Sequence, residues 1–158
     1  MIVQLGISEI NTQIVANELG KVLADETVLY IKTKNAHWNV VGIDIYENHD
    51  FFDSQLHKLD EITDSLAEHI RAIGHYAPAR MVSYLSLTHL SETKSEKNDS
   101  QGFIKELLID HENIVIILRE HLKTFAIEFR IIGIIDFLNG LIEIHEQMSR
   151  FLRANITS

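Results

Sequence analysis

The sequence has no cysteine, one proline and seven glycines among its 158 residues. Without cysteine the chain can form neither disulfides nor thiolate metal sites, so imidazole and carboxylate groups are the metal ligands that it offers. That set of ligands suits iron, manganese or zinc better than copper(I). The shortage of proline and glycine leaves few breaks in regular structure, which favours long helices.

Long apolar runs and clusters of positive charge are also missing. No run approaches the roughly 18 apolar residues of a membrane span, and residues 1–19 contain no Lys or Arg that could begin a signal peptide. We therefore expect no membrane contact and a cytoplasmic location. The formal net charge is -9 and neither terminus carries a basic tail. Both features argue against nucleic-acid binding, because that affinity depends on clustered Lys and Arg.

The hydrophobic pattern predicts an all-α chain that forms a single domain over residues 1–158. The four long helices are expected from a Ser8 N-cap to about residue 34, and over about 44–73, 101–129 and 135–153. A short helix is expected near residues 79–85, followed by a polar connection over 91–100. Short links within each helix pair and a long middle crossover are the arrangement of a ferritin-like four-helix bundle.

The last two long helices are more apolar than solvated helices of a monomer. Residues 114–118 are all apolar, and apolar pairs recur at 131–132, 134–135 and 137–138. A helix that is apolar around most of its circumference is buried on more than one side. Burial inside an oligomer explains this pattern best, and an unusually thick monomer core is the alternative.

Five residues near the first turn and along the second long helix are metal ligands in chemical type: His37, His49, Asp53, Asp64 and Glu68. His49 with Asp53, and Asp64 with Glu68, are four residues apart, so each pair can converge on one ion. His37 lies across a tight turn from His49 and joins the first pair. The two halves lie roughly 20 Å apart along one helix and cannot share an ion within one chain. Two copies packed about a two-fold axis would join each half to the complementary half, giving two equivalent sites per dimer.

Each piece of this set has an ordinary structural explanation when it is taken alone. A single His near a turn is most often a surface residue, and Asp64 with Glu68 in an acidic helix would most often form a solvated face. Trp38 alone would be a core or interface aromatic. The function hypothesis therefore depends on the whole set and on the sequence around it.

That surrounding sequence resembles the signature of the Dps family, the dodecameric mini-ferritins known as DNA-protecting proteins of starved cells. The match runs through Lys32-Thr33-Lys34-Asn35-Ala36-His37-Trp38-Asn39-Val40-Val41-Gly42, His49, Asp53 and Asp64-Ser65-Leu66-Ala67-Glu68. It continues at Tyr76-Ala77-Pro78, Asp110-His111-Glu112, Asp136-Phe137-Leu138, Gly140-Leu141-Ile142-Glu143 and His145-Glu146. The resemblance therefore covers the whole length of the chain.

The resemblance implies a ferroxidase centre at the two-fold interface. His37 and His49 of one subunit would face Asp64 and Glu68 of its mate, and Asp53 would help to hold a second iron. The implied activity is oxidation of Fe(II), with hydrogen peroxide favoured over dioxygen, followed by storage of ferric mineral in a hollow shell. Trp38, beside the centre, becomes a candidate electron donor.

The chain departs from the family pattern at three places. Residues 127–132 leave Glu128 and Asp136 as the acidic candidates for a three-fold pore through which iron would pass. Arg150 stands where relatives often carry a second tryptophan, so electron donation by paired aromatics is not carried over. The basic tail that DNA-binding relatives commonly use is absent.

Three functions follow from these observations. We expect an iron-storing ferroxidase that removes Fe(II) and peroxide together. The alternative is a nucleoid-associated protein that protects DNA by coating it. A third hypothesis is an interaction protein that keeps the shell without the chemistry, but its expected sign is broken ligand positions, and all five are intact.

Overall fold

The computed structural model describes residues 6–92, 99–129 and 131–156. The elements, in chain order, are α1 (Glu9–Asn39), α2 (Ile45–Ala72), α3 (Met81–Leu87), α4 (Ser100–Thr124), a π-helical turn η1 (Phe125–Phe129) and α5 (Ile132–Ala154). These residues contain no β-strand element, which confirms the prediction of an all-α fold.

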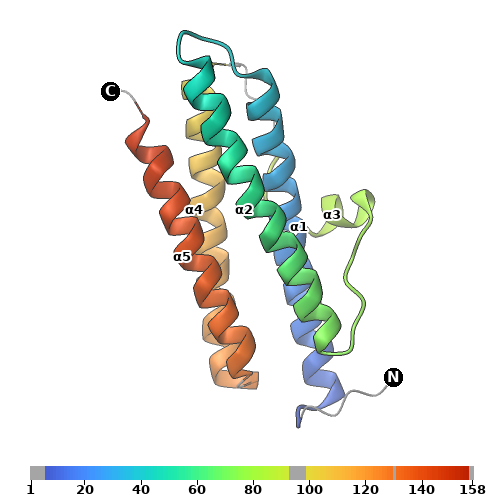
Figure 1. Ribbon diagram of the computed structural model, residues 1–158. Helices are drawn as coiled ribbons and strands as arrows, with labels where there is room; N and C mark the ends of the chain where they lie inside the picture. Colours follow the sequence, from blue (N-terminus) through green and yellow to red (C-terminus); the bar gives the residue numbers. More distant parts are fainter. Residues whose placement is uncertain (1–5, 93–98, 130, 157–158) are drawn as a thin grey trace.

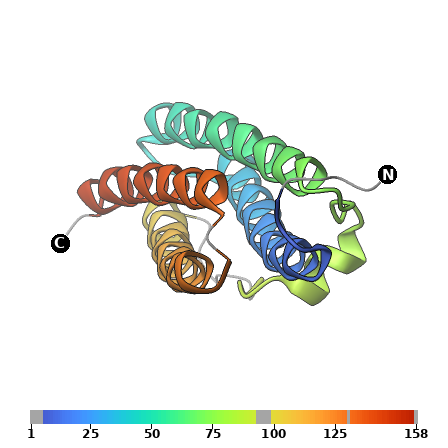
Figure 2. The ribbon, with the colours of Figure 1, turned by 90° about the horizontal axis from the view of Figure 1, so that it is seen from below.

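The four long helices pack side by side as two antiparallel hairpins, α1 with α2 and α4 with α5 (Figures 1 and 2). α2 ends at one end of the bundle and α4 begins at the other (Figure 1). The connection between them therefore crosses the length of the bundle, and α3 packs beside α1 along this path. This is the predicted ferritin-like arrangement, with a short helix inside the crossover.

α1 begins at the predicted N-cap and continues beyond its predicted end. The Ser8 hydroxyl accepts a hydrogen bond from the Asn11 N–H at 3.2 Å. The helix reaches Asn39 instead of ending near residue 34. The polar residues around position 33 do not end the helix, because Thr33 is fully buried and its hydroxyl donates a hydrogen bond to the Leu29 carbonyl at 2.8 Å. The functional consequence is that His37 lies on a helix and not in a turn.

The turn between α1 and α2 requires a glycine. Gly42 has a φ of 138°, a conformation that other residues rarely adopt, and a Cβ there would lie 3.1 Å from Asp44 Oδ1. Asp44 also accepts a hydrogen bond from the Ser100 hydroxyl at 3.2 Å. The turn is thereby fastened to the start of α4.

The later elements differ from prediction mainly at their ends. The short helix spans Met81–Leu87, slightly after the expected 79–85. The chain is helical to Phe129 as predicted, but Phe125–Phe129 widens into a π-helix. α5 begins at Ile132, before the expected residue 135. Residues 93–98 of the predicted polar connection lie outside the described part of the chain.

The core is aliphatic and aromatic, yet many apolar side chains remain outside it. Phe52, Leu59 and Leu138 are completely buried. Ile109, Ile116 and Ile132, by contrast, are 58%, 59% and 73% exposed, which shows that one subunit does not bury all the apolar surface of α4 and α5. None of the described helices is long and apolar enough to cross a membrane.

A buried polar chain crosses the core and links the two hairpins. Glu26 of α1, His111 of α4 and His145 of α5 are each 0% exposed. His145 Nε2 lies 2.8 Å from Glu26 Oε1, and its Nδ1 lies 2.8 Å from His111 Nδ1. Burial lowers the pKa of His111 well below its ordinary value, and the charge of His145 lowers it further. His111 is therefore neutral at neutral pH.

Candidate metal centre

Two of the predicted ligands meet where α1 and α2 are joined. His37, on the last turn of α1, and His49, on the first turns of α2, have ring centroids 3.8 Å apart. His37 Nδ1–H donates to the His49 carbonyl, with 3.1 Å between nitrogen and oxygen. That bond fixes the tautomer of His37 and leaves its Nε2 lone pair free for a cation.

Asp53 completes this half of the predicted site. Its Oδ1 lies 4.0 Å from His37 Nε2, and its Oδ2 lies 3.4 Å from His57 Nε2. The Asp53 side chain is 49% exposed, so the carboxylate can change its rotamer at low cost. The structure therefore gathers His37, His49 and Asp53 at one end of the hairpin, as the spacing in the sequence predicted.

The other predicted pair, Asp64 and Glu68, lies further along α2. Both residues are exposed, and among the described residues neither side chain forms an ion pair or hydrogen bond. At about 1.5 Å per residue, His49 and Asp64 are separated by roughly 20 Å of helix. One subunit does not bring these carboxylates to the histidines.

The predicted electron donor, Trp38, follows His37 directly and is 70% exposed. The ammonium of Lys34 lies 5.5 Å from the centroid of the Trp38 ring and 4.9 Å from that of Tyr30. The same Lys34 also donates a hydrogen bond to the Tyr30 hydroxyl at 2.9 Å. A large exposed indole next to a candidate metal ligand is a surface suited to a partner subunit.

No complete metal site is formed by one subunit in the described part of the chain. There, no group of three or more His, Asp or Glu side chains is arranged to hold a metal ion. The pore candidates Glu128, in η1, and Asp136, in α5, are both exposed. Arg130, which lies between them, is outside the described residues.

Some polar groups that were not predicted from the sequence lie inside the bundle. His111 and His145 belong to matched motifs, but no role was assigned to either. On α5 the buried residues Leu138, Leu141 and Leu152 define the core face, and the same face carries His145. Helical spacing could therefore have identified a buried histidine, but not its partner Glu26, which lies 119 residues away in the sequence.

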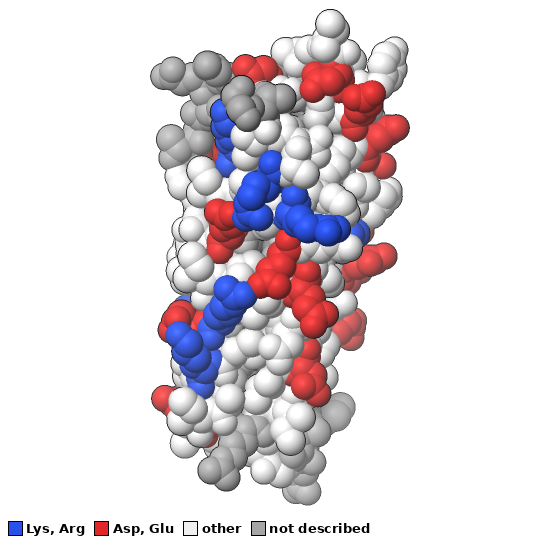
Figure 3. Space-filling view, turned by 90° about the vertical axis from the view of Figure 1, so that its left-hand side faces the viewer, with Lys and Arg blue, Asp and Glu red and all other residues white. Residues whose placement is uncertain are grey.

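The surface formed by α4 and α5 carries both signs of charge. Figure 3 shows basic and acidic side chains adjoining on the side of the molecule that carries these helices. Arg119 pairs with Glu146, and Arg153 pairs with Glu112. Positive groups on this face are thus partly neutralised by neighbouring carboxylates.

Comparisons with known proteins agree on one family. The ferritin-like domain model matches residues 16–158. An uncharacterized low temperature-induced protein of Nostoc is 35% identical over 98% of this chain and 86% of its own length. The DNA protection during starvation protein of Helicobacter pylori is 31% identical over 58% of this chain and 63% of its own. The crystal structure of the Dps protein from Vibrio cholerae O1 superposes with a TM-score of 0.91 at 23% identity, covering 99% of this chain and 98% of that protein.

Proposed function

Because the chain belongs to the ferritin-like superfamily and, within it, to the Dps family, we propose that it is an iron-storing mini-ferritin that oxidises Fe(II). The active sites would lie between two subunits. The observation that supports this proposal most directly is that the candidate ligands form two groups at different places on the chain. His37, His49 and Asp53 lie near one end of α2, while Asp64 and Glu68, about 20 Å away on the same helix, have no partner among the described residues.

The donor chemistry fits iron as a substrate. Imidazole holds Fe(II), and hard carboxylate oxygens stabilise Fe(III) more than Fe(II), which favours oxidation at the site. The His37 Nε2 lone pair is directed away from the bond that its Nδ1 makes, so it is available to the ion. Two carboxylates from the other subunit would complete the set while leaving positions open for the oxidant.

A shared site requires subunits to associate, and exposed apolar residues support a homo-oligomer. Trp38, Ile43 and Tyr46 are 70%, 105% and 86% exposed around the hairpin that carries the histidines. Exposed apolar residues gathered in this way mark contact surfaces between proteins. We propose a dodecameric shell, as in the family, with ferric mineral stored inside.

The proposed reaction takes one electron from each of two Fe(II) ions. One hydrogen peroxide molecule accepts both electrons, its O–O bond breaks, and both oxygens leave as hydroxide. The Fe(III) ions then hydrolyse, release protons and enter the mineral. Peroxide is the preferred oxidant in this proposal, so Fe(II) and peroxide are removed together and less hydroxyl radical is formed. We propose Trp38, which directly follows His37 in the sequence, as the donor of a further electron when only one iron is present.

The first test removes the unpaired carboxylates. Asp64→Ala with Glu68→Ala should leave assembly intact and slow Fe(II) oxidation by more than about tenfold, because it deletes oxygen ligands and no core residue. Oxidation is followed by absorbance after anaerobic Fe(II) loading and peroxide addition, with particle mass measured on the same sample. Asp60→Ala with Glu61→Ala is the matched control, since it removes the same charges from exposed positions of the same helix. Equal rates for both double variants would refute the ferroxidase assignment.

The same structure predicts weak DNA binding. The chain has a net charge of -9, and two arginines of the α4–α5 face, Arg119 and Arg153, are paired with carboxylates. The assembled particle should not retard duplex DNA at neutral pH and physiological salt, because phosphate and shell repel each other. Gel retardation across a pH series measures this. Retardation at neutral pH would favour the nucleoid-binding alternative, whereas retardation only at mildly acidic pH would point to protonated histidines.

A further inference from the structure

The carboxylate of Asp53 lies between two histidines. Its Oδ1 is 4.0 Å from His37 Nε2, and its Oδ2 is 3.4 Å from His57 Nε2. A nitrogen–oxygen separation of 4.0 Å is too long for a hydrogen bond, but an ion bound to both atoms at about 2 Å can span it. One oxygen of Asp53 is therefore turned toward the predicted ligand His37, and the other toward a histidine to which no role has been assigned.

His57 lies on the face of α2 that carries the candidate ligands. It follows Asp53 by four residues, so the helix itself brings the two side chains together. Asp64 and Glu68 follow on the same face, two and three turns further along. The proposed dimer would cover this face with a second subunit. The His57 side chain, which is 79% exposed in one subunit, would then become buried.

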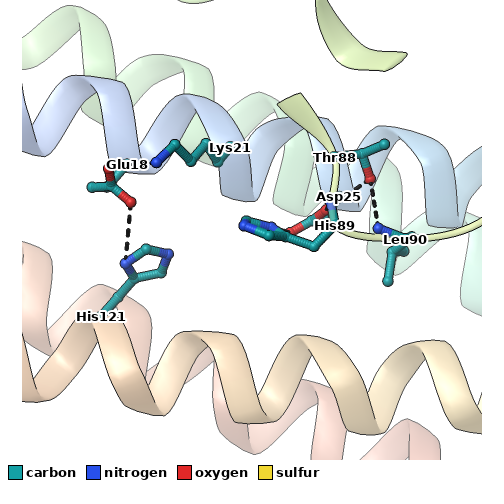
Figure 4. Close-up of polar contacts among 7 residues, drawn as sticks. All are labelled: Glu18, Lys21, Asp25, Thr88, His89, Leu90 and His121. Carbon is teal, nitrogen blue, oxygen red and sulfur yellow. Dashed lines mark hydrogen bonds and ion pairs between the residues drawn. The ribbon is translucent and has the colours of Figure 1, made fainter. Parts of the chain in front are cut away.

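Two other histidine–carboxylate pairs of this chain show the effect of burial. Asp25 is 1% exposed, and its carboxylate accepts a hydrogen bond from His89 Nδ1–H at 2.9 Å (Figure 4). Glu26 and His145 are completely buried, and 2.8 Å separates their oxygen and nitrogen. A buried carboxylate is costly unless donors satisfy it, so such pairs are short. The exposed pair on α2 is weak in water, and we expect it to shorten when a second subunit covers it.

The other charged neighbours of His57 do not take the place of Asp53. Glu61 also lies four residues from His57, on the side away from Asp53. Among the described residues, His57 makes an ion-pair contact with Asp53 and none with Glu61. The adjacent Lys58 donates a hydrogen bond to Gln147 at 3.3 Å. The contact of His57 is thus with a predicted iron ligand and not with an ordinary surface carboxylate.

We propose that His57 is a positioning residue of the iron site. In the assembled protein its Nε2–H donates a hydrogen bond to Asp53 Oδ2, and this bond keeps Oδ1 directed toward the ion. The inference rests on the proposed function, because it assumes a ferroxidase centre shared by two subunits. Hydrogen bonds of this kind orient the ligands of a metal, and the loss of one typically lowers metal affinity or activity by about 10- to 100-fold. His57 itself does not contact the ion, because its Nε2 hydrogen is used by Asp53.

Two substitutions of His57 and one of its neighbour give a matched test. His57→Ala removes the donor, whereas His57→Gln retains one, because the amide nitrogen of Gln lies close to the place of histidine Nε2. Lys58→Ala is the control, since it removes an adjacent basic side chain that bonds to Gln147 and not to Asp53. Anaerobic titration of the assembled particles measures the affinity for Fe(II). Initial rates of oxidation by peroxide over a range of Fe(II) concentrations give KM and kcat, and particle mass is measured on the same samples.

His57→Ala should weaken Fe(II) binding by about tenfold or more and raise KM more than it lowers kcat, because a ligand of the ion loses its orientation. The particle mass should not change. His57→Gln and Lys58→Ala should bind Fe(II) nearly as well as wild type. In a subunit that already carries Asp53→Ala, His57→Ala should cause no further loss, since His57 acts through that carboxylate. A purely structural role for His57 would not produce this dependence on Asp53.

Three results would each overturn the proposal: equal Fe(II) affinity for His57→Ala and wild type, a His57→Gln variant as weak as His57→Ala, or losses from His57→Ala and Asp53→Ala that add. The binding titration also separates this inference from the proposed function. A wild-type particle that binds Fe(II) without oxidising it would refute the ferroxidase assignment, while the affinities of the variants would still decide the role of His57.

Discussion

Subunits carrying His37→Ala with His49→Ala, co-refolded with subunits carrying Asp64→Ala with Glu68→Ala, should recover roughly a quarter of wild-type Fe(II) oxidation. Each double variant alone should be inactive, because every site lacks one half of its ligands. In a mixed two-fold dimer, one site loses both halves. The other joins the intact histidines of one chain to the intact carboxylates of its partner. Random pairing makes about half of the dimers mixed, and half of their sites are complete.

The control for this experiment is the same unfolding and refolding of each variant alone. Particle mass must show that both kinds of subunit are present in one assembly. Activity that stays at the level of the separate variants would exclude a site shared between subunits. We expect recovery because the ring centroids of His37 and His49 lie 3.8 Å apart, whereas Asp64 is far from both.

The subunit should also lose stability as the pH falls below about 6.5, because of the buried His111. Its folded-state pKa is lowered by burial first and by His145 second, whereas the unfolded chain takes up a proton near the ordinary value. The unfolded state therefore binds more protons in this range. This contribution to stability is complete above the pKa of His111 in the unfolded chain. It is lost as the pH falls toward the lower pKa of His111 in the folded subunit. One such group changes the unfolding free energy by about 1.4 kcal/mol per pH unit.

Urea unfolding at a series of pH values and a fixed subunit concentration measures this effect. On the acid side, His111→Asn should reduce the slope of the unfolding free energy against pH by the amount that corresponds to one proton. This change in slope is expected even if the variant is less stable at every pH. His57→Asn, at a side chain that is 79% exposed, is the control and should keep the wild-type slope. Parallel curves for wild type and His111→Asn would show that this histidine does not govern acid stability.

Much of the fold was predictable because it depends on local patterns. The apolar spacing and scarce breakers predicted four long helices, and Ser8 marked the start of α1. The end of α1 was not predictable in the same way. Thr33 and Lys32 look like a polar interruption, but tertiary packing buries Thr33 and pairs Lys32 with Asp110 at 2.6 Å. Packing partners distant in sequence thus extended the helix.

The sequence also predicted the first half of the candidate site, which contains His37, His49 and Asp53. His49 and Asp53 share a helix face, and a tight turn at Gly42 brings His37 beside them, so sequence spacing alone implies their proximity. The same spacing separates Asp64 from them. Whether another subunit supplies the missing half remains a prediction for the mixed-subunit experiment.

The sequence by itself determined the helices, the ligand types and the positions that share a helix face, because each depends on residues a few positions apart. Only the tertiary structure decided which polar groups meet between helices. Glu26 lies 119 residues from His145, and Asp25 lies 64 residues from His89. Such pairs form because the hairpins and the crossover pack in one particular register. Local periodicity fixes which face of a helix is buried, but not which residue of another helix it meets.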